Sequence, residues 1–178
     1  MFAKMLPDYK VNSFKQITPA WLADQKKTAL LTDLDNTLVA RLIDEPTPEL
    51  KIWIQELLEG GIKVLLLSNN KKQERVRYFG EKLGIPYLHD VSKPSTKGFT
   101  QAFTRLSCSA QDCIMLGDQL STDILGGNRA GVTTILTSVQ SGGDLLQTRL
   151  LRWLERRFLS LVKLFGGNKK KLFTFSLF

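Results

Sequence analysis

The sequence contains few of the residues that build disulfide frameworks or zinc sites. Its 178 residues include two cysteines and one histidine. Cys108 and Cys113 form no Cys-x-x-Cys unit and a single imidazole cannot assemble a His/Cys cluster, so structural zinc is not expected and a reducing compartment fits. No apolar run approaches the roughly 20 residues that span a bilayer, and residues 1–11 contain no apolar core with a cleavage signal. We expect a cytoplasmic protein without signal peptide or transmembrane helix.

Acidic residues are scarce at the C-terminal end of the chain. From Arg149 onward there are eight basic residues and one acidic residue, Glu155, so this segment carries +7 of the formal net charge of +8. The remaining chain is almost neutral, at +1. Such a distribution argues against a basic surface covering the whole protein, and no nucleic-acid partner is expected.

Strand-like and helix-like patterns alternate along the middle of the chain. This alternation predicts βαβ crossovers and an α/β fold, a three-layer Rossmann-like arrangement with a central parallel sheet between helices. Three parts are expected: an N-terminal extension (1–27), a core domain (28–140) and a basic amphipathic tail (141–178). The expected strands cover residues 28–34, 62–67, 85–88, 113–116 and 132–136, and the expected helices begin near residues 18, 47, 71, 96 and 121.

Polar residues follow several of these predicted strands, at the point where each strand ends. Asp33 and Asp35 close the first strand, Ser68 the second, and Asp118 the fourth, while Lys93 follows the short strand at 85–88. Asp is also an ordinary loop and helix-cap residue, so the acidic pair alone would be ambiguous. Because the carboxyl ends of parallel strands form the ligand-binding crevice of open α/β sheets, the combined pattern predicts a shared site.

These residues carry a family resemblance. The chain resembles the haloacid dehalogenase superfamily of phosphatases, and more closely its capless YqeG-type subgroup, which is similar to organellar enzymes that convert phosphatidylglycerophosphate to phosphatidylglycerol. The resemblance covers roughly residues 27–139 and implies a phosphatase fold and activity. The matching motifs are Asp33-Leu34-Asp35-Asn36-Thr37-Leu38, Ser68-Asn69-Asn70, Lys93-Pro94 and Gly117-Asp118-Gln119-Leu120-Ser121-Thr122-Asp123.

Two of the acids fit a magnesium site. Mg²⁺ prefers octahedral oxygen ligation through one or two carboxylates plus substrate oxygens and water, which Asp33 and Asp118 could offer. The resemblance further implies that Asp33 is the nucleophile that forms a phosphoaspartate, and that the backbone carbonyl of Asp35 completes the protein ligands. Mg²⁺ is therefore the expected cofactor.

The remaining motif residues have expected supporting roles. Asp35 would protonate the departing alkoxide and then accept a proton from water. Ser68 and the backbone amide of Asn69 would bind phosphoryl oxygens, and Lys93 would neutralise their charge. Lys97 could substitute for Lys93, although its place in a helix favours a solvated surface charge.

Two residues are assigned outside the reacting centre. Thr37 is expected to brace its loop by a hydrogen bond from its side chain to the backbone. Asp123 would orient Lys93 or a metal-bound water, with a helix N-terminal acid as the alternative interpretation.

The chain has no room for a cap domain. About 30 residues separate Asp35 from Ser68 and about 24 separate Asn69 from Lys93, which is enough for one crossover helix each. Without a lid the substrate itself must help to exclude water. Such a site suits a bulky ester: a protein, a polynucleotide end or a lipid headgroup.

The tail suggests where such a substrate would be met. Residues 145–165 place leucines and aromatics along one helical stripe and arginines on the opposite side, a pattern typical of a helix lying in an anionic membrane interface. A helix packed against the sheet is the alternative. The expected function is Mg²⁺-dependent hydrolysis of a phosphomonoester, in particular phosphatidylglycerophosphate, at the inner face of a membrane. The rivals are a soluble phosphatase for a nucleotide, sugar phosphate or polynucleotide end, and a catalytically silent membrane or RNA adaptor; the oligomeric state stays open.

Overall fold

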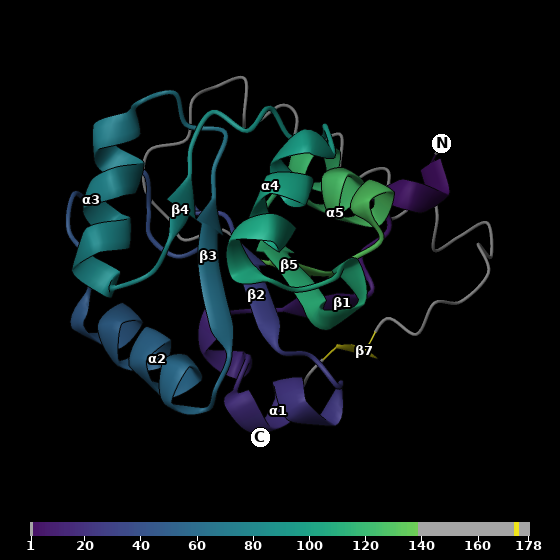
Figure 1. Cartoon of the computed structure of the whole chain (residues 1–178), viewed down its shortest axis with the longest axis horizontal. Coiled ribbons are helices and arrows are strands. Elements are labelled where there is room, and N and C mark those ends of the chain that lie inside the picture. Colours follow the sequence, from purple (N-terminus) through teal and green to yellow (C-terminus); the bar gives the residue numbers. More distant parts are fainter. Residues whose placement is uncertain (1, 139–172, 175–178) are drawn as a thin grey trace.

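The protein folds around a parallel β-sheet that lies between two layers of helices (Figure 1). This computed structural model describes residues 2–138 and 173–174. Within them the strand order is β4-β3-β2-β5-β6-β1-β7, and all the pairings are parallel. The three-layer α/β prediction is confirmed, and no further domain is inserted between residues 28 and 138. The amphipathic stripe predicted at 145–165 lies outside the described residues.

The central strands are the most apolar part of the sheet. Every residue of β2 (Ala29–Thr32) is buried, as expected for a strand covered on both faces. Side chains alternate between the faces, so Leu30 joins one hydrophobic cluster and Leu31 the other. The other strands are β1 (Tyr9–Val11), β3 (Lys63–Leu67), β4 (Tyr87–Leu88), β5 (Cys113–Gly117), β6 (Thr133–Thr137) and β7 (Phe173–Thr174).

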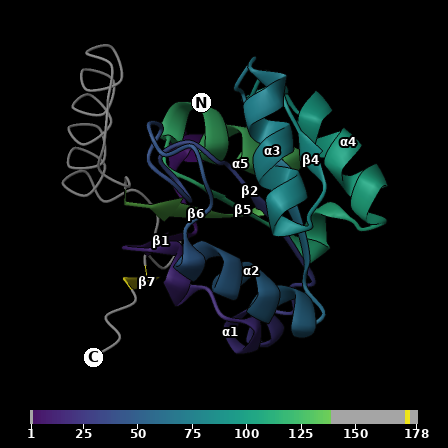
Figure 2. The ribbon, with the colours of Figure 1, turned by 90° about the vertical axis from the view of Figure 1, so that its left-hand side faces the viewer.

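The helices are divided between the two faces (Figure 2). One face packs against α1 (Pro19–Asp24), α2 (Pro48–Glu59) and α3 (Gln73–Leu83), and the other against α4 (Lys97–Leu106) and α5 (Leu125–Ala130). The described residues also form four short helices: η1 (Phe2–Met5), η2 (Phe14–Gln16), η3 (Ala110–Asp112) and the π-helical η4 (Leu120–Ile124).

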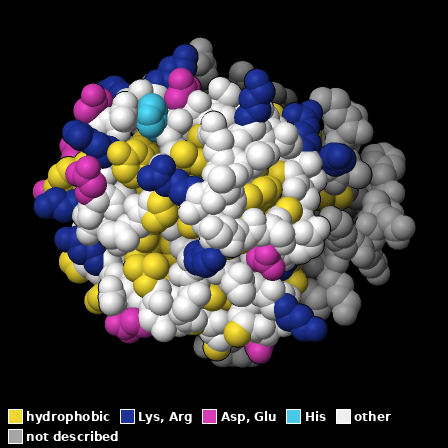
Figure 3. All heavy atoms as spheres, viewed as in Figure 1, with side chains coloured by type: hydrophobic (Ala, Val, Ile, Leu, Met, Phe, Trp, Pro, Cys, Tyr) yellow, Lys and Arg dark blue, Asp and Glu magenta, His cyan; other side chains and the backbone are white. Residues whose placement is uncertain are grey.

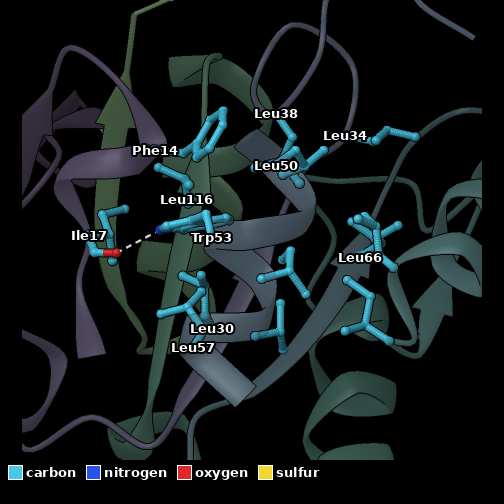
Figure 4. Packing of buried hydrophobic residues seen from close by; sticks show 14 of the residues in the cluster. Phe14, Ile17, Leu30, Leu34, Leu38, Leu50, Trp53, Leu57, Leu66 and Leu116 are labelled. Atoms are coloured by element: carbon cyan, nitrogen blue, oxygen red, sulfur yellow. Dashed lines mark hydrogen bonds between the residues drawn. The ribbon is translucent and has the colours of Figure 1, made fainter. Parts of the chain in front are cut away.

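Trp53 anchors the larger cluster (Figure 4). Its ring packs against Phe14 with centroids 4.8 Å apart, and its indole Nε1 donates to the backbone oxygen of Ile17 at 2.8 Å. The hydrogen bond satisfies the one polar atom of a buried indole. It also fastens the N-terminal segment to α2.

The predicted helix starts near residues 18 and 47 are confirmed, and their caps explain them. Thr18 and Thr47 each accept a hydrogen bond from a backbone amide in the first turn, and each is followed by proline. A threonine cap before proline satisfies one free donor and removes another. At the C-terminal end of α3, Gly84 adopts φ 68° and ends the helix before β4.

The N-terminal segment, expected only as an extension, contributes β1 to the sheet beside β6. Asp8 leads into this strand, and its Oδ2 accepts hydrogen bonds from the backbone amide and the hydroxyl of Thr134. A strand of three residues has too short a pattern to be recognised in the sequence. The domain boundary at residue 27 stays a prediction.

The structure offers no helix, within its described residues, with the length and hydrophobicity to cross a bilayer.

Candidate active site

The site lies where the three central neighbouring strands end. Asp33 follows β2, Ser68 follows β3 and Asp118 follows β5, and β2 pairs with both of the others. Parallel pairing brings their carboxyl ends to the same edge of the sheet. The backbone amide of Asp33 extends this pairing by donating to Leu116 O at 3.0 Å. The sheet itself therefore positions the predicted residues together.

Three buried carboxylates form the centre of the site. Asp33, Asp118 and Asp123 each have an oxygen within 4.8 Å of the others, and each residue is at most 7% exposed. The predicted proximity of Asp33 and Asp118 is thus observed. A compact set of carboxylate oxygens matches the ligand preference of a hard divalent cation such as Mg²⁺. The donor set fits the expected metal.

Lys93 lies between two of these acids. Its Nζ is 2.8 Å from Asp33 Oδ1 and 2.7 Å from Asp123 Oδ1, and it donates to the carbonyl of Leu67 at 2.6 Å. The contacts with Asp33 and Leu67 are hydrogen bonds and the contact with Asp123 is an ion pair, so three groups hold the ammonium in place. Lys97 is exposed at the first residue of α4, so the structure brings Lys93 and not Lys97 into the site.

Asn69 holds the backbone of Lys93 from both sides. Its side-chain Nδ2 donates to the backbone oxygen of Lys93 at 3.0 Å, and its side-chain Oδ1 accepts from the backbone nitrogen of Lys93 at 2.6 Å. The sequence predicted a role only for the Asn69 backbone, in phosphate binding. The side chain has a separate task, which is to fix the loop that carries the lysine.

Burial and neighbouring charges act in opposite directions on these groups. Burial raises the pKa of the Asp33 carboxyl, the Lys93 ammonium opposes this rise, and the nearby Asp123 adds to it. For Lys93, burial alone lowers the pKa, but the carboxylates of Asp123 and Asp33 outweigh it and hold the pKa above its ordinary value. The lysine is therefore a fixed positive charge. A cation beside Asp33 would favour the ionised form of that carboxyl.

Asp123 is held by the π-helical turn η4 that follows β5. Besides its ion pair with Lys93, its Oδ2 accepts a hydrogen bond from the Gln119 amide at 3.1 Å. Both interpretations of this residue, lysine orientation and helix-start acid, are compatible with these contacts. Gly117 makes the arrangement possible, because a Cβ at that position would lie 2.3 Å from the Cβ of Asp123.

The loop after β2 is braced at several points. Thr37 Oγ1 donates to Asp118 Oδ1 at 3.3 Å, so its recorded partner is a carboxylate rather than the backbone that was predicted. Asn36 adopts φ 64°, a left-handed conformation that asparagine tolerates well, and its amide donates to Val39 O at 2.7 Å. This turn keeps Asp33 and Asp35 at the same opening.

Asp35 is held by two residues, Asn70 and Arg75, for which the sequence predicted no role in the site. Asn70 Nδ2 donates to Asp35 Oδ2 at 2.8 Å, and Arg75 Nε lies 2.9 Å from Asp35 Oδ1. Arg75 also reaches Asp44 at 3.3 Å and lies over the ring of Phe79, 5.0 Å from its centroid. The sequence signal was an arginine in the first turn of α3, beside the buried stripe that begins at Val76. Its partner could not be inferred without the tertiary fold.

Ser68 faces the pocket next to these groups, and its Oγ accepts a hydrogen bond from the Asn70 amide at 3.1 Å. All the residues that line the pocket are polar or charged, and they include both acidic and basic groups. Such a cavity can hold an anionic group between fixed cations while presenting a carboxylate to it. Its lining consists of Asp33, Asp35, Asn36, Arg41, Ser68, Asn69, Asn70, Lys93, Gln119, Thr122 and Asp123.

Comparison with known proteins agrees with this geometry. The family model of the haloacid dehalogenase-like hydrolases matches residues 3–131. The chain is 44% identical over 158 residues to the probable phosphatase YqeG of Bacillus subtilis, covering 89% of this chain and 91% of that protein. It is 32% identical over 114 residues to the chloroplastic phosphatidylglycerophosphate phosphatase 1 of Chlamydomonas reinhardtii, covering 60% of this chain and 42% of that protein.

A solved structure shares the fold at low sequence identity. It is the cobalt-bound deoxy-D-mannose-octulosonate 8-phosphate phosphatase of Haemophilus influenzae, with a TM-score of 0.55 at 16% identity, covering 82% of this chain and 92% of that one. The likeness concerns the fold alone. The family model and the relative from Bacillus subtilis show that the chain belongs to the haloacid dehalogenase-like hydrolases, as one of their phosphatases.

Proposed function

We propose that the chain is a Mg²⁺-dependent phosphomonoesterase that acts through a phosphoaspartate and hydrolyses phosphatidylglycerophosphate at a membrane surface. The observation that carries the chemistry is the convergence of Asp33, Asp118, Asp123 and Lys93 at one edge of the sheet, with Asp35 at the same opening. The lipid substrate is suggested by the relative from Chlamydomonas.

The first half of the reaction uses the acidic pair. The Asp33 carboxylate attacks phosphorus, a bond forms between its oxygen and phosphorus, and the bond to the leaving alkoxide breaks. Asp35 gives its proton to that alkoxide. Lys93, already fixed beside Asp33, offsets negative charge on the phosphoryl oxygens, and Ser68 donates a hydrogen bond to one of them.

The second half returns the enzyme to its starting state. Asp35 accepts a proton from water, the resulting hydroxide attacks phosphorus, and the phosphoaspartate bond breaks to release phosphate and the free Asp33 carboxylate. Mg²⁺, held by the carboxylates of Asp33 and Asp118 and the backbone carbonyl of Asp35, would supply neutralising charge to the phosphoryl oxygens.

Membrane attachment through the tail is the second part of the proposal. Eight basic residues lie between Arg149 and Lys171, and near an anionic leaflet each contributes about 1 kcal/mol.

On the face drawn in Figure 3, basic and acidic side chains are interspersed rather than gathered by sign. This pattern does not favour nucleic acid as the partner of that face.

A substrate panel tests the proposal. Phosphate release is measured with Mg²⁺ on phosphatidylglycerophosphate in mixed micelles, on nucleotides, on sugar phosphates and on an aryl phosphate, with Asp33→Asn as the inactive control. We expect the highest kcat/KM on the lipid. Higher kcat/KM on a sugar phosphate or nucleotide would favour the soluble phosphatase. Equal rates for wild type and Asp33→Asn on every ester would leave the silent adaptor.

A further inference from the structure

Two neighbouring apolar side chains protrude next to the pocket. Among the residues whose side chains the structure describes, four large hydrophobic ones are markedly exposed: Leu42, Ile43, Ile52 and Leu58. Leu42 and Ile43 are 70% and 43% exposed and directly follow Arg41, which lines the pocket. Single exposed apolar residues are ordinary, so the significant feature is the pair beside the site opening.

The segment that carries them is a held turn. The Ile43 amide donates to Ala40 O at 2.9 Å, which places Arg41 and Leu42 at the tip of the turn. The backbone amide of Arg41 also donates to Asn36 Oδ1 at 3.3 Å, which ties the turn to the loop after β2. The apolar side chains are thus presented outward by a fixed backbone.

The two acidic residues that follow the turn contact side chains of α3. Asp44 pairs with Arg75 at 3.3 Å, and Glu45 accepts a hydrogen bond from the Tyr78 hydroxyl at 3.1 Å. The turn therefore presents a cation and two apolar groups, and each of its two acids has a partner on α3. Two more exposed cations, Lys71 and Lys72, directly follow the pocket residue Asn70.

We infer that Arg41, Leu42, Ile43, Lys71 and Lys72 form a lipid-contact surface that rests on an anionic bilayer while a phosphate headgroup occupies the pocket. The inference rests on the proposed function. Apolar side chains next to lysine and arginine match the boundary between acyl chains and anionic headgroups. A patch of two aliphatic residues is far smaller than a stable protein interface, which buries about 800 Å² on each partner. In this arrangement the bilayer covers a pocket for which the described residues supply no cap domain.

The first test measures binding without catalysis. The full-length chain is titrated with substrate-free vesicles of phosphatidylcholine and phosphatidylglycerol, comparing wild type with the double variant Leu42→Ser/Ile43→Ser. Removing two inserting side chains should weaken partitioning by about tenfold or more. Ile52→Ser and Leu58→Ser remove exposed apolar side chains from α2 and serve as matched controls, with expected partitioning equal to wild type. Unchanged partitioning of the double variant would overturn the inference.

The second test separates lipid contact from chemistry. We expect the double variant to lose about tenfold in kcat/KM on phosphatidylglycerophosphate added to vesicles of the same lipids, and to keep wild-type kcat/KM on a soluble aryl phosphate. Equal losses on both esters would show that the turn serves the pocket and not the membrane. If wild type hydrolyses the aryl phosphate but not the lipid, the proposed substrate fails, and the vesicle titration still decides whether this surface binds lipid.

Discussion

Asp33 and Asp35 stand two residues apart in the chain, yet the fold holds their carboxylates in different ways. Asp33 belongs to a buried centre in which Lys93, Asp118 and Asp123 are each at most 5% exposed. Asp35 belongs to a rim held by Arg75 and Asn70, and Arg75 also pairs with the solvent-exposed Asp44. The centre is assembled by the ends of the central strands, whereas the rim depends on a helix and two loops.

The difference assigns separate tasks to the two regions. Charges that are buried together gain much from one another and lose much when one is removed, so the centre is suited to keep a nucleophile and its counter-charges in place. The side chains of Asp35 and Arg75 are 15% and 13% exposed, against 1% each for Lys93 and Asp123, so Asp35 can exchange its partners at a smaller cost. This suits a residue that must give up and take back a proton. Substitutions in each region should therefore have different profiles of rate and stability.

The largest effect is expected from Lys93→Met. It leaves Asp33 and Asp123 buried without their shared cation, so the free energy of unfolding should fall by roughly 3–5 kcal/mol and kcat/KM by at least about 10³-fold. Denaturant unfolding and aryl phosphate hydrolysis measure the two quantities. Lys97→Met, on the exposed start of α4, is the matched control and should change neither. A stable, active Lys93→Met protein would contradict the role given to the centre.

A smaller but still clear effect is expected from Gly117→Ala. The new Cβ would meet Asp123 at 2.3 Å, so the carboxylate must move away from Lys93. We expect a loss of about 1–3 kcal/mol in the free energy of unfolding together with a lower kcat. Gly80→Ala is the control: its new Cβ would lie 2.6 Å from Tyr87, and neither residue lines the pocket. This variant should lose stability but keep the kcat of the folded enzyme. Normal kcat in Gly117→Ala would show that Asp123 need not stay against Lys93.

The rim should respond in rate more than in stability. Arg75→Ala frees Asp35 from its ion pair, and kcat should fall by about 10- to 100-fold, while the free energy of unfolding changes by about 1 kcal/mol. Arg77→Ala, on the exposed side of the same helix, is the control and should match wild type. If Arg75→Ala and Arg77→Ala behave alike, Arg75 does not position Asp35.

Metal binding offers the gentlest probe of the centre. At about one hundred times its dissociation constant, Mg²⁺ should stabilise the wild-type protein by about 2.7 kcal/mol, visible as a higher Tm. Asp118→Asn removes one of the expected ligands and should abolish most of this rise. The rim variant Arg75→Ala should keep it. An equal rise in Tm for wild type and Asp118→Asn would remove Asp118 from the metal site.

The sequence predicted the centre better than the rim for a physical reason. Asp33, Ser68 and Asp118 end neighbouring parallel strands, so recognising the strands was enough to bring them together. Arg75 meets Asp35 only because α3 packs beside the loop after β2, a contact with no local signature. Asn70 belongs to the motif Ser68-Asn69-Asn70, but the motif alone does not show that its side chain reaches Asp35. Likewise, β1 could not be predicted, because three residues carry too little pattern, and it forms through pairing with β6.

The central claim is that Asp33 becomes covalently phosphorylated, and borohydride trapping tests it most directly. Rapid quenching during turnover with Mg²⁺ and an aryl phosphate, followed by reduction and peptide mass spectrometry, should convert Asp33 to homoserine, because an acyl phosphate is reduced where a free carboxylate is not. Asp35 and Asp118 should remain unchanged. Homoserine at another position, or no reduction at Asp33 during active turnover, would contradict the account.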